Sequence, residues 1–134
     1  MAKLINVEGI GPIYAEKLKR AGLSTTDGLL KKGATPTGRR EIAEKAGVSE
    51  HQVLEWVNRV DLFRIKGVAE EYSDLLENAG VDTVVELAQR NAANLFEKMS
   101  QVNASRKVVR KLPAQSQIED WIAQARRLPR AVSY

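Results

Sequence analysis

A glycine turn that occurs twice constrains the fold of this 134-residue chain more than any other feature. In its first copy, Gly9, Ile10 and Gly11 lead into Pro12, and helices tolerate proline best at their first position. Apolar residues then recur at helical spacing, and Gly22 stands where a helix ends in a C′ glycine. Because glycine reaches positive φ without a Cβ clash, the pattern predicts a tight turn that opens directly into a helix.

The same pattern returns at Gly67, 58 positions after Gly9. Residues of the same kind then match in register: Tyr14 with Tyr72, Leu18 with Leu76, Gly22 with Gly80, Thr25 with Thr83, and Leu29 with Leu87. Such self-similarity indicates an internal duplication. It predicts two repeats, over residues 1–61 and 62–134, each too small to bury much apolar surface alone. We therefore expect the two repeats to pack as one compact body.

Helical periodicity dominates both repeats. In the first, we expect helices over residues 12–21, from the caps at 24–27 to near Gly33, over 39–46, and onward from the capping box at 49–52. In the second, we expect helices over 70–79, 84–90, 93–99 and 117–128. Pro36 and Pro113 predict loops over 33–38 and over most of 100–116. No run alternates with period two over strand length, so the predicted fold class is all-α.

Composition excludes several classes of protein. The 43% hydrophobic and 28% charged content is that of a globular domain rather than a disordered chain. The absence of cysteine excludes disulfides, thiolate zinc sites and thiol nucleophiles. No stretch approaches the ~20 apolar residues of a membrane span, and no apolar signal segment follows the N-terminus, so a cytoplasmic location is expected.

The net charge of +4 is distributed unevenly along the chain. Residues 1–61 carry 10 basic and 8 acidic side chains, residues 62–104 carry 4 and 7, and residues 105–134 carry 7 and 2. The second glycine turn therefore lies in an acidic segment, with basic segments before and after it. If nucleic acid binds, the first turn and the last segment are the better candidates.

The turn with its helix resembles a helix-hairpin-helix motif, which occurs in DNA ligases, junction-binding proteins and repair nucleases. In that family, backbone amides of the Gly-hydrophobic-Gly turn and of the next helix N-terminus hold a DNA phosphate. The strings at residues 34–40, 56–67 and 88–91 make the whole chain resemble a bacterial family of uncharacterised tandem helix-hairpin-helix proteins. One departure weakens the second copy: Ala69, Glu70 and Glu71 stand where a glycine and an uncharged helix start are expected.

The resemblance implies phosphate contacts, for which the chain offers four groups of residues. The first turn supplies Gly9, Ile10, Gly11, the amide of Ile13, and Lys17 one helical turn further on. The other groups are Arg39 and Arg40 at a predicted helix start, the weaker set of Arg64, Lys66 and Gly67, and the basic run of Arg106, Lys107, Arg110 and Lys111. Each group also has a plainer interpretation. The first turn could be purely structural, and the two arginines of the second group could be an ordinary surface pair. The third group could be a scaffold or a protein contact, and the basic run could be a solvated loop.

Other conspicuous side chains favour structure over chemistry. The tyrosines at 14 and 72 and the tryptophans at 56 and 121 recur at matching places on apolar helix faces, which predicts core packing. The lone histidine, His51, has no second metal ligand nearby. No nucleophile–base pair and no Walker-type phosphate-binding loop appears. We therefore expect neither an enzyme nor a cofactor. The expected function is non-sequence-specific DNA binding, and the alternative is a protein-interaction module.

Overall fold

The computed structural model describes residues 3–7, 9–68 and 70–134. All regular secondary structure in these ranges is helical, which confirms the all-α prediction. The chain divides into two compact units: unit 1 comprises Met1–Asp61 and Arg130–Tyr134, and unit 2 comprises Leu62–Pro129. Residues 130–134 thus belong with the first unit, although in sequence they follow the second repeat.

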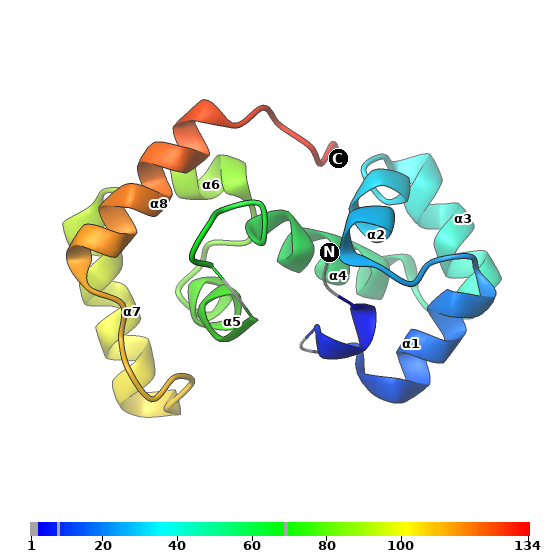
Figure 1. Cartoon of the computed structure of the whole chain (residues 1–134), viewed down its shortest axis with the longest axis horizontal. Helices are drawn as coiled ribbons and strands as arrows, with labels where there is room; N and C mark the ends of the chain where they lie inside the picture. The colour runs from blue at the N-terminus through cyan, green and yellow to red at the C-terminus, as the bar shows by residue number, and fades with distance from the viewer. Residues whose placement is uncertain (1–2, 8, 69) are drawn as a thin grey trace. The chain divides into compact units, whose positions relative to one another are not determined.

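Unit 1 contains a short 3-10 helix followed by four α-helices (Figure 1). They are η1 (Leu4–Asn6), α1 (Gly11–Arg20), α2 (Thr26–Lys32), α3 (Pro36–Ala46) and α4 (Glu50–Leu62), the last of which ends at the first residue of unit 2. Helix α1 packs against η1 and α3, and α2 also packs against α3. The capping box at the start of α4 is confirmed, since Gln52 N donates to Ser49 Oγ at 3.0 Å and Ser49 N to Gln52 Oε1 at 3.4 Å.

Helix α3 begins three residues earlier than the sequence predicts. Pro36 occupies the first turn of the helix, where its missing N–H costs nothing. The hydroxyl of Thr35 accepts a hydrogen bond from Gly38 N at 3.1 Å and so caps the helix. The prediction of a loop over 33–38 was wrong because Pro36 was interpreted as a helix breaker, whereas it starts this helix.

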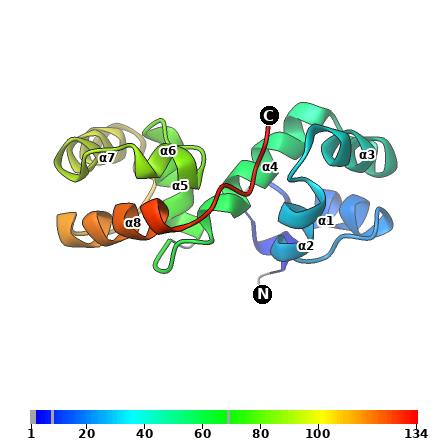
Figure 2. The same cartoon turned by 90° about the horizontal axis from the view of Figure 1, so that it is seen from above.

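Over residues 62–68 and 70–129, unit 2 contains four helices (Figure 2), and buried apolar residues from all of them form a core. They are α5 (Glu70–Asn78), α6 (Val84–Ala88), α7 (Ala92–Arg106) and α8 (Gln115–Arg127). Helix α8 packs against α6 and α7, and α5 packs against α7. The side chains of Thr83 and Asn91 cap α6 and α7 by accepting from the amides of Glu86 and Asn94.

Helix α7 ends seven residues later than predicted, at Arg106 rather than Met99. Residues 100–106 contain no helix breaker, and Val102 continues the apolar face of the helix into the core of unit 2. The helix ends at Lys107, which has left-handed backbone angles (φ 51°, ψ 48°). Pro113 therefore affects only the connection from Lys107 to Ala114, and the prediction of a loop over most of 100–116 was wrong.

Each unit is built around one tyrosine–tryptophan pair. Trp56 and Trp121 are only 4% and 2% exposed, which confirms that they are core residues. The rings of Tyr14 and Trp56 lie 5.2 Å apart in unit 1, and those of Tyr72 and Trp121 lie 5.4 Å apart in unit 2, both tilted. The matching pairs explain why both aromatic types recur at corresponding sequence positions.

Candidate nucleic-acid interface

The first glycine turn has two residues in the left-handed backbone region, Gly9 (φ 88°) and Gly11 (φ 61°). Between them Ile10 is buried, and its amide donates to the carbonyl of Val7 at 3.0 Å. The buried isoleucine anchors the turn in the core of unit 1, while both glycines stay at the surface. A β-carbon on Gly11 would meet no atom within 4 Å, so this side of the turn is open.

Helix α1 starts directly from this turn with amides available to a ligand. The first amides of an α-helix have no carbonyl one turn upstream, and Pro12 has no amide at all. Among the described residues, neither Gly11 N nor Ile13 N donates to a carbonyl outside the helix. The first turn of α1 contains no acidic residue, so the positive end of its dipole is not neutralised there.

Lys17 lies one helical turn beyond the amides, as predicted, but its ammonium is not directed only toward solvent. Its Nζ lies 5.6 Å from the centroid of the Tyr14 ring, within the range of a cation–π interaction. The hydroxyl of Tyr14 accepts a hydrogen bond from Gln52 Nε2 at 3.2 Å, which fixes the ring. Lys17 is therefore held close to the helix surface, and it is half-buried.

An exposed apolar surface adjoins the same helix start. Ile13, in the first turn of α1, is 73% exposed, and Ile5 of η1 is 44% exposed. Ile5, Pro12 and Ala15 help line a surface hollow between η1 and α1. Among the described residues, Ile5, Ile13 and Tyr134 are the large apolar side chains that are exposed.

Arg39 and Arg40 are not arranged as a pair facing one ligand. The start of α3 at Pro36 places both arginines in the body of the helix rather than at its N-terminus. The guanidinium of Arg39 is buried and donates to Gly33 O at 2.8 Å and to Ser133 O at 2.7 Å. Arg40 is exposed and pairs with Glu50 at 3.3 Å. Of the two, only Arg40 presents its charge to solvent.

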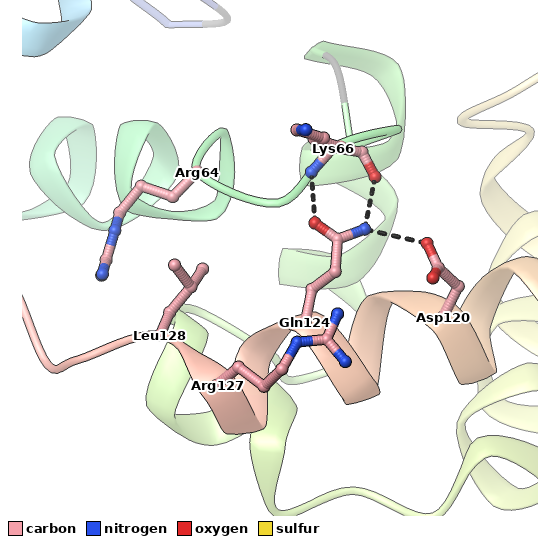
Figure 3. Close-up of a pocket in the computed structure, with 6 residues that line it drawn as sticks. All are labelled: Arg64, Lys66, Asp120, Gln124, Arg127 and Leu128. Atoms are coloured by element: carbon pink, nitrogen blue, oxygen red, sulfur yellow. Dashed lines mark hydrogen bonds between the residues drawn. The ribbon is translucent and has the colours of Figure 1, made fainter.

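The second glycine turn lies against a tryptophan. Gly67 has φ 96°, and a β-carbon there would come within 2.9 Å of Trp121 Nε1. The preceding residue is fixed at two points, since Lys66 N donates to Gln124 Oε1 at 2.8 Å and Gln124 Nε2 donates to Lys66 O at 3.1 Å (Figure 3). Ala69 and the side chain of Glu70 lie outside the described residues, whereas Glu71 is exposed.

Basic side chains border a hollow beside this turn. Its lining residues are Arg64, Lys66, Asp120, Gln124, Arg127 and Leu128 (Figure 3). The carboxylate of Asp120 accepts from Gln124 Nε2 at 2.8 Å, and Arg64 donates to the carbonyl of Pro129. Sequence reasoning missed Arg127 because nothing in its local pattern links it to the turn; the packing of α8 beside Lys66 brings the two together.

The basic run at 106–111 is partly helix and partly connection. Arg106 is the last residue of α7 and donates to Asn78 Oδ1 at 2.6 Å. Lys107, Arg110 and Lys111 are exposed, whereas Val109 between them is buried. The run therefore presents three solvated cations around one apolar anchor.

Residues 8–128 match the model of a protein family that is described as a domain of unknown function, DUF4332. The chain belongs to the DUF4332 family. The matched span contains both glycine turns and both tryptophans, and it stops before residues 130–134. No curated protein and no solved structure matches the chain.

Two features are absent from the described part of this DUF4332 chain. Within residues 3–7, 9–68 and 70–134, no three histidine, cysteine or carboxylate side chains gather as metal ligands would. None of the helices described there has the length and apolar character that crossing a membrane requires.

Proposed function

We propose that the two units are helix-hairpin-helix repeats and that the chain binds DNA without sequence specificity, through backbone phosphates. The observation that supports this proposal best is the turn of Gly9 and Gly11, which opens into the acid-free first turn of α1. The amides at a helix start and the positive end of a helix dipole together favour an anion. The proposed site comprises Gly9, Ile10, Gly11, the amide of Ile13, and Lys17.

Lack of sequence specificity follows from the groups in the proposed site. Amides and a lysine ammonium bind phosphate oxygens and do not distinguish base edges. Arg40, Lys107, Arg110 and Lys111 are exposed cations that could add further phosphate contacts, whereas Arg39 is removed from the proposal because its guanidinium is occupied. With roughly three to five phosphates neutralised, the logarithm of affinity should fall with that of salt concentration at a slope of about −3 to −4.5.

The decisive experiment compares two substitutions at Gly11. Asn and Asp both tolerate left-handed backbone angles and have nearly the same size, and the space around Gly11 is open. Gly11→Asp adds a negative charge at the amides, while Gly11→Asn adds none. Fluorescence anisotropy with labelled duplex, single-stranded and junction DNA at roughly 50 and 200 mM salt should show binding lost in Gly11→Asp and largely retained in Gly11→Asn.

Two results would contradict the proposal: undetectable binding of the unmodified chain at low salt, or equal binding by the Asp and Asn variants. Equal binding that disappears when Lys107, Arg110 and Lys111 are changed to Gln would instead place the contact at the basic run. A second pair of variants compares Lys17→Gln with Lys19→Gln as its matched control. Both lysines lie on α1, but Lys19 is exposed whereas Lys17 is half-buried.

The exposure of Ile13 favours a second candidate, a protein-interaction module. An isoleucine that is 73% exposed beside the turn gains more from contact with an apolar partner than from contact with a phosphate. Under this alternative, Ile13→Ser should abolish partner binding, and any association should respond weakly to salt. Loss of DNA binding in Gly11→Asp with retention in Ile13→Ser would favour the DNA proposal.

A further inference from the structure

Residues 130–134, the terminal segment, pack within unit 1 without regular secondary structure. Ser133 N donates to Ala34 O at 2.8 Å, and Ser133 O accepts from Arg39 at 2.7 Å. The side chain of Val132 is 3% exposed. The hydroxyl of Tyr134 hydrogen bonds with Asn58 Oδ1 at 3.1 Å. Main-chain bonds thus fix the register of the segment, and two side chains are recognised individually.

Arg39 differs in chemical character from its counterpart in unit 2. Arg39 N donates to Thr35 O, the N-cap of α3, and Leu95 N donates to Asn91 O, the N-cap of α7, so the two residues occupy equivalent helix positions. Both are buried, but Leu95 belongs to an apolar core. A buried guanidinium is costly unless its donors are satisfied, and here two backbone carbonyls accept from it, one of them in the terminal segment.

Two of the receiving groups on unit 1, Ala34 and Arg39, also have close surroundings within unit 1. The bond from Arg39 to Gly33 O orients the guanidinium from within unit 1. The connection from α2 to α3 is tightly packed: a β-carbon on Gly33 would lie 2.5 Å from Val57 Cγ2, and one on Gly38 would overlap the carbonyl oxygen of Lys32. The carbonyl of Ala34 lies in this closely packed connection, which favours one direction for it.

We propose that Ala34, Arg39 and Asn58 form a preformed peptide-binding site, the segment site, which binds the terminal segment as a separable ligand. The ligand class is an extended peptide with an aliphatic residue, then a small residue, then a tyrosine. The aliphatic side chain enters the core, the main chain of the small residue bonds to Ala34 and Arg39, and the tyrosine ring lies near the guanidinium groups of Arg39 and Arg130 at 6.0 and 5.8 Å.

The test supplies the ligand from outside to a chain whose own segment is disabled. Full-length protein carrying Val132→Asp retains the segment site but places a charge where the buried aliphatic residue belongs. It is titrated with a synthetic peptide of residues 129–134, acetylated and amidated, while the backbone amide signals of Gly33, Ala34 and Asn58 are followed by NMR. We expect saturable shifts, and an apparent affinity at least roughly tenfold weaker in the unmodified chain, because its own segment competes at a high effective concentration.

Arg39→Leu, which introduces the residue found at the equivalent position of unit 2, is the matched control. Added to Val132→Asp, it should abolish peptide binding while the helical circular dichroism signal is retained. Absence of saturable shifts in Val132→Asp, or binding undiminished by Arg39→Leu, would overturn the proposal. A peptide with the order of residues 130–134 scrambled should give no shifts, and equal binding of that peptide would also overturn it.

A second measurement does not depend on Val132→Asp remaining folded. In the unmodified chain, the amide of Ser133 should exchange with solvent at least about tenfold more slowly than an unprotected amide, because it donates to Ala34. Arg39→Leu should remove this protection while the amides of α4 stay protected. Exchange of Ser133 at the unprotected rate in the unmodified chain would refute the site, and Tyr134→Ala replaces Val132→Asp in the titration if the latter does not fold.

Discussion

Gly67 and the indole of Trp121 are in such close contact that a β-carbon on the glycine would lie 2.9 Å from Nε1 of the ring. The corresponding distance from Gly9 to Trp56 Nε1 in unit 1 is 3.8 Å, an ordinary contact. Both glycines also have positive φ, at 96° and 88°. The two turns therefore share a backbone conformation but differ in how closely each approaches its tryptophan.

This difference predicts unequal costs for the same substitution. Gly9→Ala should lower the free energy of unfolding of its unit by about 1–2 kcal/mol, through backbone strain alone. Gly67→Ala should cost about 1 kcal/mol more, because the indole must also move. Each unit contains one tryptophan, so denaturation followed by fluorescence in a Trp121→Phe or a Trp56→Phe background reports on unit 1 or unit 2 separately. Equal losses would contradict the prediction.

The N-cap of α3 gives a second prediction with an adjacent control. Thr35 accepts from Gly38 N, whereas Thr37 is an exposed threonine inside the helix. Thr35→Ala should lower the free energy of unfolding by about 1 kcal/mol. Thr37→Ala should leave it unchanged or raise it slightly, because alanine is the better helix former. Thermal or chemical unfolding of the two variants measures the difference, and a similar loss in both would argue against the cap.

The carboxyl group of Glu41 should titrate below its ordinary range. A hydrogen bond from Lys32, and then the charge of that lysine, lower the pKa of Glu41. A lowered pKa means that any stabilisation from this pair is present above the ordinary glutamate pKa and is lost as pH falls through the lowered value. NMR titration of the carboxyl signal should show this shift, and Lys32→Gln should reverse most of it. A titration unaffected by Lys32→Gln would show that the lysine is not the cause.

The side chain of Asn103 should keep the connection after α7 in a single conformation. Its side chain accepts from Val109 N at 2.9 Å and donates to Val109 O at 3.1 Å, so one amide group satisfies both main-chain atoms. Asn103→Ala should speed hydrogen exchange at Val109 by on the order of tenfold or more and cost about 1–2 kcal/mol. The near-isosteric Asn103→Asp keeps the acceptor but loses the donor, so it should have an intermediate effect. Unchanged exchange in Asn103→Ala would contradict the assignment.

Local signals in the sequence were sufficient for the helical class and most helix positions. The tryptophans at 56 and 121 were correctly predicted to be buried, and the half-buried tyrosines at 14 and 72 pack against them, since apolar periodicity and recurrence both depend on neighbouring residues. The start of α3 was mispredicted because proline either breaks or begins a helix, and only the bond from Gly38 N to Thr35 decides between the two. The end of α7 was mispredicted because Pro113 was expected to make most of 100–116 a loop, whereas its effect is confined to the connection after Arg106.

The environment of Arg39 could not have been predicted from its neighbours. Its acceptor at Ser133 is 94 positions away along the chain, so no local pattern links the two residues. An arginine in an amphipathic helix is ordinarily solvated. The same limitation applies to Arg127 and Lys66, which line one hollow only because α8 packs beside the second turn.

The contact between residues 34 and 133 also has a consequence for the order of events during synthesis. The ribosome releases residues 3–61 well before residues 130–134, and domains generally begin to fold as they emerge. Unit 1 can form its helices early, but Arg39 lacks one of its two carbonyl acceptors until Ser133 is made. All of residues 62–129 are synthesised in that interval, so unit 1 begins to form before unit 2 but receives this acceptor only after unit 2 has been made.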